Sequence, residues 1–133
     1  MKTYVRVAVG GEHYAIAVER VREVAEIGTV VPVPGAGPNI LGIRHLHGEV
    51  LPVVGLTGLL GAPAGAPVQR IVVVEDERRR AGLGVDVVDG VGELPEPDAA
   101  GHPLTRGAVL DRGALVGVLD VHALLDAVSA SVA

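Results

Sequence analysis

The sequence repeats itself at an offset of 65 residues, and this repeat limits the possible architectures more than any single motif does. In each copy two glycines bound a run of five residues, an apolar run follows, and a short segment ends in Leu-Leu. The matched positions are Gly42 with Gly107, Gly48 with Gly113, Val53 with Val118, and Leu59-Leu60 with Leu124-Leu125. We therefore predict two equivalent units of hairpin plus helix, in two β-rich halves that pack together.

The boundary between the halves is predicted at residues 61–67, which consist only of Gly, Ala and Pro. Such a composition forms no packed element and suits a flexible crossover. A weaker repeat relates residues 15–19 to residues 82–86 at an offset of 67. The length of 133 residues suits one domain.

The high valine content favours sheet, because the branched Cβ of Val fits a pleated surface and loses rotamer freedom in a helix. The chain has 26 Val and neither Phe nor Trp. Residues 3–9 and 12–17 are predicted to form the first two strands, since Gly10-Gly11 between them supplies the positive φ angles of a tight turn.

Two segments have helical patterns. Val18, Val21 and Val24 recur every three residues among charged side chains, which predicts a helix of about two turns whose apolar side faces the core. Residues 121–128 are predicted to form a second helix, capped by the Asp120 carboxylate.

Charge and cysteine content exclude several classes of function. A net charge of −5 argues against nucleic acid, and the basic run at residues 78–80 follows an acidic run that cancels most of its field. This segment is predicted to be a solvated hairpin tip. With no Cys, disulfides and thiolate sites are excluded. We expect neither a signal peptide nor a segment that spans a membrane, and we expect a cytoplasmic protein.

No set of residues points to catalysis. His45 and His47 are predicted to share one face of a strand, but no third ligand lies at matched spacing, so no metal is expected. Asp86 and Asp89 lie where a strand enters a turn, which favours a structural role. We therefore predict that the chain is not an enzyme and uses no cofactor.

Many positions along the chain resemble the CheW-like adaptor domain. The most specific stretch is a Gly-x5-Gly-x2-Leu-Pro-Val-Val pattern over residues 42–54. Further matches are Tyr14-Ala15-Ile16, Val18, Val21, Glu23, Val72-Val73-Val74, Gly84-Val85-Asp86, Leu119-Asp120 and Leu124-Leu125. The resemblance implies a mainly β fold in which two SH3-like five-stranded β-barrels, with short helices, pack around a shared core. It also implies one domain over residues 1–133, with approximate subdomains 16–82 and 1–15 plus 83–133.

The family couples a methyl-accepting chemoreceptor tip to a CheA-like histidine kinase regulatory domain, and it has no cofactor. By resemblance, Val18, Val21 and Glu23 match positions on the receptor-facing side, which makes Val21 a partner contact rather than core. His47 is also assigned to the partner-binding surface, where the family usually has Arg and where the internal repeat has Arg112.

Three polar positions depart from the family: His45 and His47 replace Asn and Arg, and Gly55 replaces Asp. Positions that build the barrels are kept, whereas polar groups for a surface have changed. The leading hypothesis is a non-catalytic signalling adaptor. A small-molecule or metal-binding sensory module, with its ligand in the cleft between the barrels, is the alternative.

Overall fold

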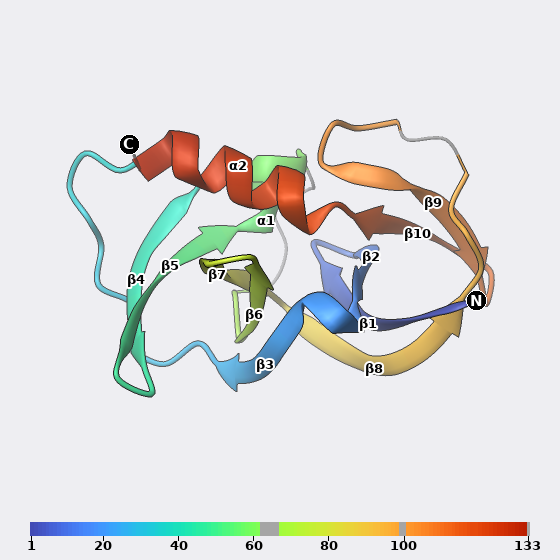
Figure 1. Cartoon of the computed structure of the whole chain (residues 1–133), viewed down its shortest axis with the longest axis horizontal. Coiled ribbons are helices and arrows are strands. Elements are labelled where there is room, and N and C mark those ends of the chain that lie inside the picture. The colour runs from blue at the N-terminus through green and yellow to red at the C-terminus, as the bar shows by residue number, and fades with distance from the viewer. Residues whose placement is uncertain (62–66, 99–100, 133) are drawn as a thin grey trace.

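The computed structural model describes residues 1–61, 67–98 and 101–132, so most of the predicted crossover at residues 61–67 lies outside the described residues. Two five-stranded sheets make up the fold (Figure 1). Sheet A has the order β8 (Val87–Leu94), β1 (Lys2–Val9), β2 (Glu12–Ala17), β10 (Ala114–Leu119), β9 (Thr105–Asp111). Sheet B has the order β3 (Val21–Glu26), β6 (Arg70–Asp76), β7 (Arg79–Val85), β5 (Glu49–Gly55), β4 (Ile40–Leu46).

The internal repeat is confirmed, because its two copies occupy equivalent places in different sheets. The hairpin β4–β5 and the helix α1 (Leu56–Leu60) correspond to the hairpin β9–β10 and the helix α2 (Val121–Val132). In sheet B, β5 runs parallel to β7, and in sheet A, β10 runs parallel to β2. The weaker repeat relates β2 to β7, which confirms that the sheets share one topology.

Gly42 and Gly107, the first glycines of the two copies, are required by a close approach of backbone to backbone. Gly42 has φ +148°, and a Cβ there would collide with the carbonyl oxygen of Val31. Gly107 has φ +134°, and its Cβ would collide with the carbonyl oxygen of Asp98. Glycine alone tolerates both the backbone angle and the contact.

These approaches bring extra segments against β4 and β9. Val31 and Ile43 form an isolated bridge beside β4, with N···O distances of 2.9 and 2.8 Å. The amide of Asp98 donates to the carbonyl of Ala108 in β9 at 3.1 Å. Among the described residues no continuous ladder joins the end strands of either sheet. The two-sheet, SH3-like fold agrees with the expectation, although hydrogen bonding does not close the barrels.

Buried side chains form three clusters, which follows from the alternation of side chains along each strand. Tyr4, Ala15, Leu94, Val109, Val116 and Val118 cluster within sheet A. Leu51, Val53, Ile71 and Val73 cluster within sheet B. The largest cluster takes residues from both sheets and from α2, among them Val7, Ile16, Val72, Leu83 and Leu124. It is the shared core expected from the family resemblance.

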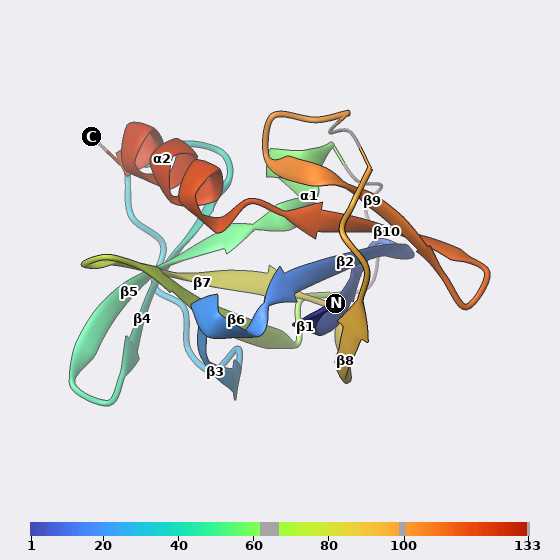
Figure 2. The same cartoon turned by 45° about the vertical axis from the view of Figure 1, so that its right-hand side comes forward.

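The helix α2 follows β10 of sheet A but packs against β6 and β7 of sheet B (Figures 1 and 2). Its predicted cap is confirmed, since the Asp120 carboxylate accepts a hydrogen bond from the Ala123 amide at 3.0 Å. The helix continues to Val132, beyond the expected end at residue 128. Within the described residues, no helix is both long and apolar enough to cross a membrane.

The helix predicted over residues 18–24 is wrong. Only residues 18–20 turn, as the 3₁₀ helix η1 (Val18–Arg20), and residues 21–26 form β3. Exposure alternates along β3, and its Val24 and Ala25 pair with Val72 and Ile71 of β6. Pairing with a neighbouring strand outweighs the three-residue spacing of valines, which have a low helix propensity in any case.

Candidate protein-docking surface

Two of the four predicted partner-binding residues lie against each other. His47 lies in the turn between β4 and β5, and its Nε2 is 3.1 Å from Oε2 of Glu23 on β3. The His47 side chain is 74% exposed. Since β3 and β4 are the end strands of sheet B, this polar pair spans the open side of that sheet.

The turn that carries His47 has a positive φ at both central residues, 50° at His47 and 79° at Gly48. Such angles suit the tight hairpin turns that match strand twist. Arg112 and Gly113 repeat the geometry in the second hairpin, with φ 52° and 78°. The expectation that His45 and His47 share a strand face is wrong, because His47 has left the strand.

The other two predicted residues differ in exposure. Val18 in η1 is 42% exposed. Val21, the first residue of β3, is half-buried and packs against the shared core. Val18 therefore offers its side chain to a partner more fully than Val21 does.

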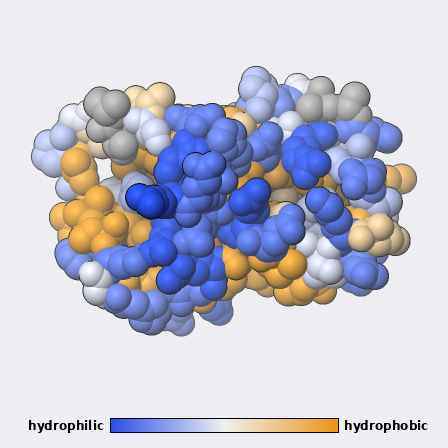
Figure 3. Space-filling view, in the orientation of Figure 1, coloured by the Kyte–Doolittle hydropathy of each residue, from blue (hydrophilic) through white to orange (hydrophobic). Residues whose placement is uncertain are grey.

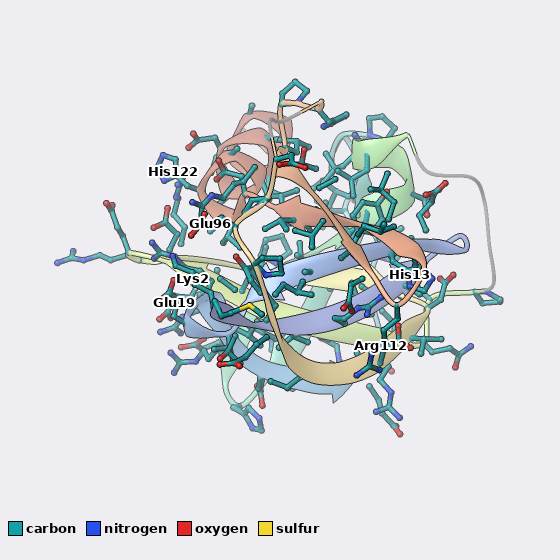
Figure 4. The ribbon with its side chains drawn as sticks, turned by 90° about the vertical axis from the view of Figure 1, so that its right-hand side faces the viewer. Lys2, His13, Glu19, Glu96, Arg112 and His122 are labelled. Atoms are coloured by element: carbon teal, nitrogen blue, oxygen red, sulfur yellow. The ribbon has the colours of Figure 1, made fainter. Side chains whose placement is uncertain are left out.

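A groove lies beside Val18, between η1 and the start of α2, the two segments that lead from sheet A toward sheet B. We call it the inter-sheet groove; it has a volume of about 280 Å³, and its lining includes Lys2, Glu19, Arg20, Arg106, Leu119 and His122, from sheet A and these two segments. Figure 4 shows Lys2, Glu19 and His122 on one side of the molecule, away from His13 and Arg112. Its lining contains positive, negative and apolar side chains, which suits a peptide surface that carries charged and apolar groups.

Ion pairs run across sheet B on the hairpin β6–β7. The Glu75 carboxylate accepts from Arg22 at 3.0 Å and from Arg80 at 2.5 Å, and Arg80 also donates to Glu49. The hydrogen bond from Arg80 is the main cause that lowers the pKa of Glu75. The expected cancellation of charge between the acidic and basic runs of this hairpin is therefore made by specific ion pairs between neighbouring strands.

Asp76 corrects the prediction of a fully solvated hairpin tip. Glu77 and Arg78 are exposed at the turn, but Asp76 is only 5% exposed. Its carboxylate meets Arg20, Arg79 and His122. The four-residue spacing of His122 and Asp126 was a local signal for one contact in this group, but no pattern linked either residue to Asp76.

Within the described residues, no group of three His, Asp or Glu side chains is arranged to hold an ion. The Asp86 carboxylate accepts from the Gly10 amide at 2.9 Å, and the Asp86 amide donates to the Ala8 carbonyl at 3.1 Å. Asp86 thus ties the β7–β8 junction to the first hairpin, which is a structural contact.

Apolar surface gathers on sheet B. A hollow of about 360 Å³ is lined by Val33, Pro34, Gly35, Ala36, Ile40, Ile43 and Pro52. Val31, Leu41 and Val50 are also exposed. Figure 3 shows hydrophobic colour toward the side of β4 and the loop before it, whereas the middle of that face is hydrophilic.

Two topologically equivalent sheets around a shared core, with an exposed groove between η1 and α2, define a two-sheet, SH3-like domain. The family model described as "CheW-like domain" matches residues 3–129. The chain belongs to the CheW-like family, a family of scaffold and adaptor proteins in chemotaxis.

Relatives and a solved structure agree with this assignment. The chemotaxis protein CheW of Rhizobium meliloti (strain 1021) is 28% identical over 127 residues, covering 87% of this chain and 82% of that protein. The protein FrzA of Myxococcus xanthus is 30% identical over 123 residues, covering 91% and 76%. The crystal structure of the scaffolding protein TtCheW from Thermoanaerobacter tengcongensis matches with a TM-score of 0.82 at 24% identity, covering 90% and 84%, and supports the fold.

Proposed function

We propose that this chain is a non-catalytic adaptor that couples a chemoreceptor to a histidine kinase by binding both. Its partners are the tip of a methyl-accepting chemoreceptor and the regulatory domain of a CheA-like kinase, and it works in the cytoplasm. Membership of the CheW-like family supports the class of function.

The observation that carries the receptor half of the proposal is the inter-sheet groove with Val18 exposed beside it. Val18 and Glu19 also line a second hollow with Lys2 and Thr3. An exposed apolar side chain flanked by charges is typical of a docking surface, where an apolar centre supplies affinity and a polar rim supplies specificity.

Val18→Glu tests this surface more cleanly than Val21→Glu. Val21 contacts the shared core, so a carboxylate there would disturb packing as well as binding. At the exposed position 18 the same change should cost no more than about 0.5 kcal/mol of stability. We expect Val18→Glu to weaken binding of a receptor-tip fragment by about tenfold or more in titration calorimetry.

The matched control is Val87→Glu, because Val87 is 49% exposed and pairs with Ala8, at the end of β1 opposite Lys2. This variant should bind the fragment as wild type does. Size-exclusion chromatography with the kinase regulatory domain should show a complex for both variants. Equal loss of receptor binding in both variants, or no binding of either partner by the wild-type chain, would refute the proposal.

A further inference from the structure

Two of the segments that link the sheets meet around one buried acid, whereas the direct connection from β7 to β8 lies elsewhere, at Asp86. From β2 of sheet A the chain reaches β3 of sheet B through η1, and from β10 of sheet A it reaches sheet B through α2. Asp76, at the end of β6, lies where both connections meet the hairpin β6–β7. It is the buried charged residue of the described chain, at 5% exposure.

The contacts of Asp76 come from three elements. Its Oδ1 is 3.4 Å from Nη1 of Arg20 in η1. Its Oδ2 accepts from Nδ1 of His122 in α2 at 2.5 Å and from Nη2 of Arg79 in β7 at 3.0 Å. Arg79 also donates to Asp126 of α2 at 2.5 Å. A buried carboxylate with this many donors is satisfied only while the three elements keep their positions.

The same two partners form the walls of the inter-sheet groove. Arg20 belongs to the wall made by η1, and His122 belongs to the wall made by the start of α2. Both walls are therefore tied to one carboxylate. Loss of either contact leaves that wall without its bond to Asp76.

We propose that Asp76, Arg20 and His122 form a clamp that sets the shape of the inter-sheet groove and thereby tunes its affinity for the receptor tip. The part about affinity rests on the proposed function, whereas the part about groove shape does not. Neither Asp76 nor His122 is among the positions that the family resemblance assigned to partner binding. Asp76 does not line the groove and is a positioning residue, whereas His122 both lines the groove and contacts Asp76.

The strength of the clamp depends on the protonation of His122. Nδ1 of His122 lies 2.5 Å from a carboxylate oxygen of Asp76, so this nitrogen must carry a hydrogen. It therefore cannot accept a hydrogen bond from Nη2 of Arg79, which lies 3.2 Å away. On the other side of the ring, Nε2 is 3.5 Å from Oδ2 of Asp126. The doubly protonated ring thus faces a carboxylate at each nitrogen. The neutral ring keeps its Nδ1 hydrogen bond to Asp76, without the charge that strengthens it, and loses the contact with Asp126.

The direction of the pH dependence follows from both partners. The hydrogen bond with Asp76, and then the charge of Asp126, raise the pKa of His122 above its usual value, so its contribution is lost as pH rises through the raised pKa. The hydrogen bonds from His122 and Arg79 lower the pKa of Asp76, so its contribution is lost only as pH falls below the usual range for Asp. The clamp is complete between these two limits.

The test compares the wild type with His122→Asn and Arg20→Gln. Asn can still donate one hydrogen bond but does not titrate in this range, and Arg20 is exposed enough to be replaced without unfolding. Residual dipolar couplings of amides in η1, α2 and sheet A report the orientation of the two walls of the groove at about pH 6 and about pH 8.5. The matched control is His45→Asn, since His45 is exposed and lies outside the clamp.

We expect the orientation of η1 relative to α2 to change between the two pH values in the wild type and in His45→Asn, and to stay constant in His122→Asn. Arg20→Gln should shift the orientation at both. Receptor-tip affinity of the wild type should fall by about tenfold at the higher pH, a typical size for a coupling between sites. Couplings that are independent of pH in the wild type, or a full pH response in His122→Asn, would overturn the clamp. A pH-dependent orientation without any receptor binding would support the clamp and reject the proposed function.

Discussion

Leu124→Ala tests whether the two sheets share one core. Leu124 of α2 is fully buried, at 0% exposure, in the cluster that joins both sheets. Because Ala has the highest helix propensity, the change should leave α2 helical and remove only packing. Buried Leu→Ala changes cost about 2–5 kcal/mol, and we expect about 3 kcal/mol here. That is a large part of the total stability of a domain, typically about 5–15 kcal/mol.

Urea unfolding followed by far-UV circular dichroism measures the loss. With a slope of about 1–3 kcal/mol per M, the midpoint should fall by about 1–3 M. Native-state hydrogen exchange then locates the loss, through the amides of Val72 in sheet B and Val116 in sheet A. A shared core predicts that both amides lose the same free energy of opening.

The matched control is Leu110→Ala, because Leu110 on β9 is 74% exposed. It should change stability by no more than about 0.5 kcal/mol. If Leu124→Ala costs less than about 1 kcal/mol, the packing argument is wrong. If only the Val72 amide loses protection, the sheets unfold separately and the shared core does not couple them.

Two further predictions concern the turns and glycines of the repeat. Gly107→Ala should destabilise the chain far more than Gly113→Ala, because both residues have a positive φ but only position 107 lacks space for a Cβ. In urea unfolding Gly113→Ala should cost about 1–2 kcal/mol, and equal losses for the two variants would contradict the collision with Asp98. His47→Arg should keep the turn and raise the free energy of unfolding by up to about 1 kcal/mol through a charged pair with Glu23. The gain should vanish when Glu23 is replaced in the double mutant with Glu23→Gln. A gain that survives Glu23→Gln would show that position 47 acts on another group.

Local patterns predicted much of the fold correctly. Two short runs separated by Gly10-Gly11 predicted the first hairpin, and Asp120 predicted the start of α2. The repeat predicted equivalent units in two sheets, because its glycines mark turns and close backbone approaches that side chains do not tolerate. Such features depend on a few neighbouring residues, so they can be recognised without the tertiary structure.

The segment after residue 17 shows where local reasoning failed. Three valines at a spacing of three predicted a helix, yet residues 21–26 are a strand. The partner that decides this, β6, lies some fifty residues further along the chain and forms the neighbouring ladder. Propensity and periodicity describe one segment, and a neighbouring strand can override both.

The candidate site divides in the same way. The resemblance named Glu23 and His47, and the structure brings them together; whether a partner binds there stays a prediction. The clamp at Asp76 went unnoticed, because its members are 46 residues apart for His122 and 56 for Arg20. An acidic residue beside a basic run gave no sign that it would be buried.

The sequence by itself determined that the chain forms two similar β-rich units, where each hairpin turns and where α2 begins, because these depend on short-range sterics and capping. Only the tertiary structure decided how the units contact each other, since packing brings distant residues together and removes them from water. In the folded chain Val21 is half-buried, Val18 is exposed, and Asp76 lies between two segments that connect the sheets. A buried carboxylate must find donors within a few ångströms, and those donors are set by the fold rather than by their distance along the chain.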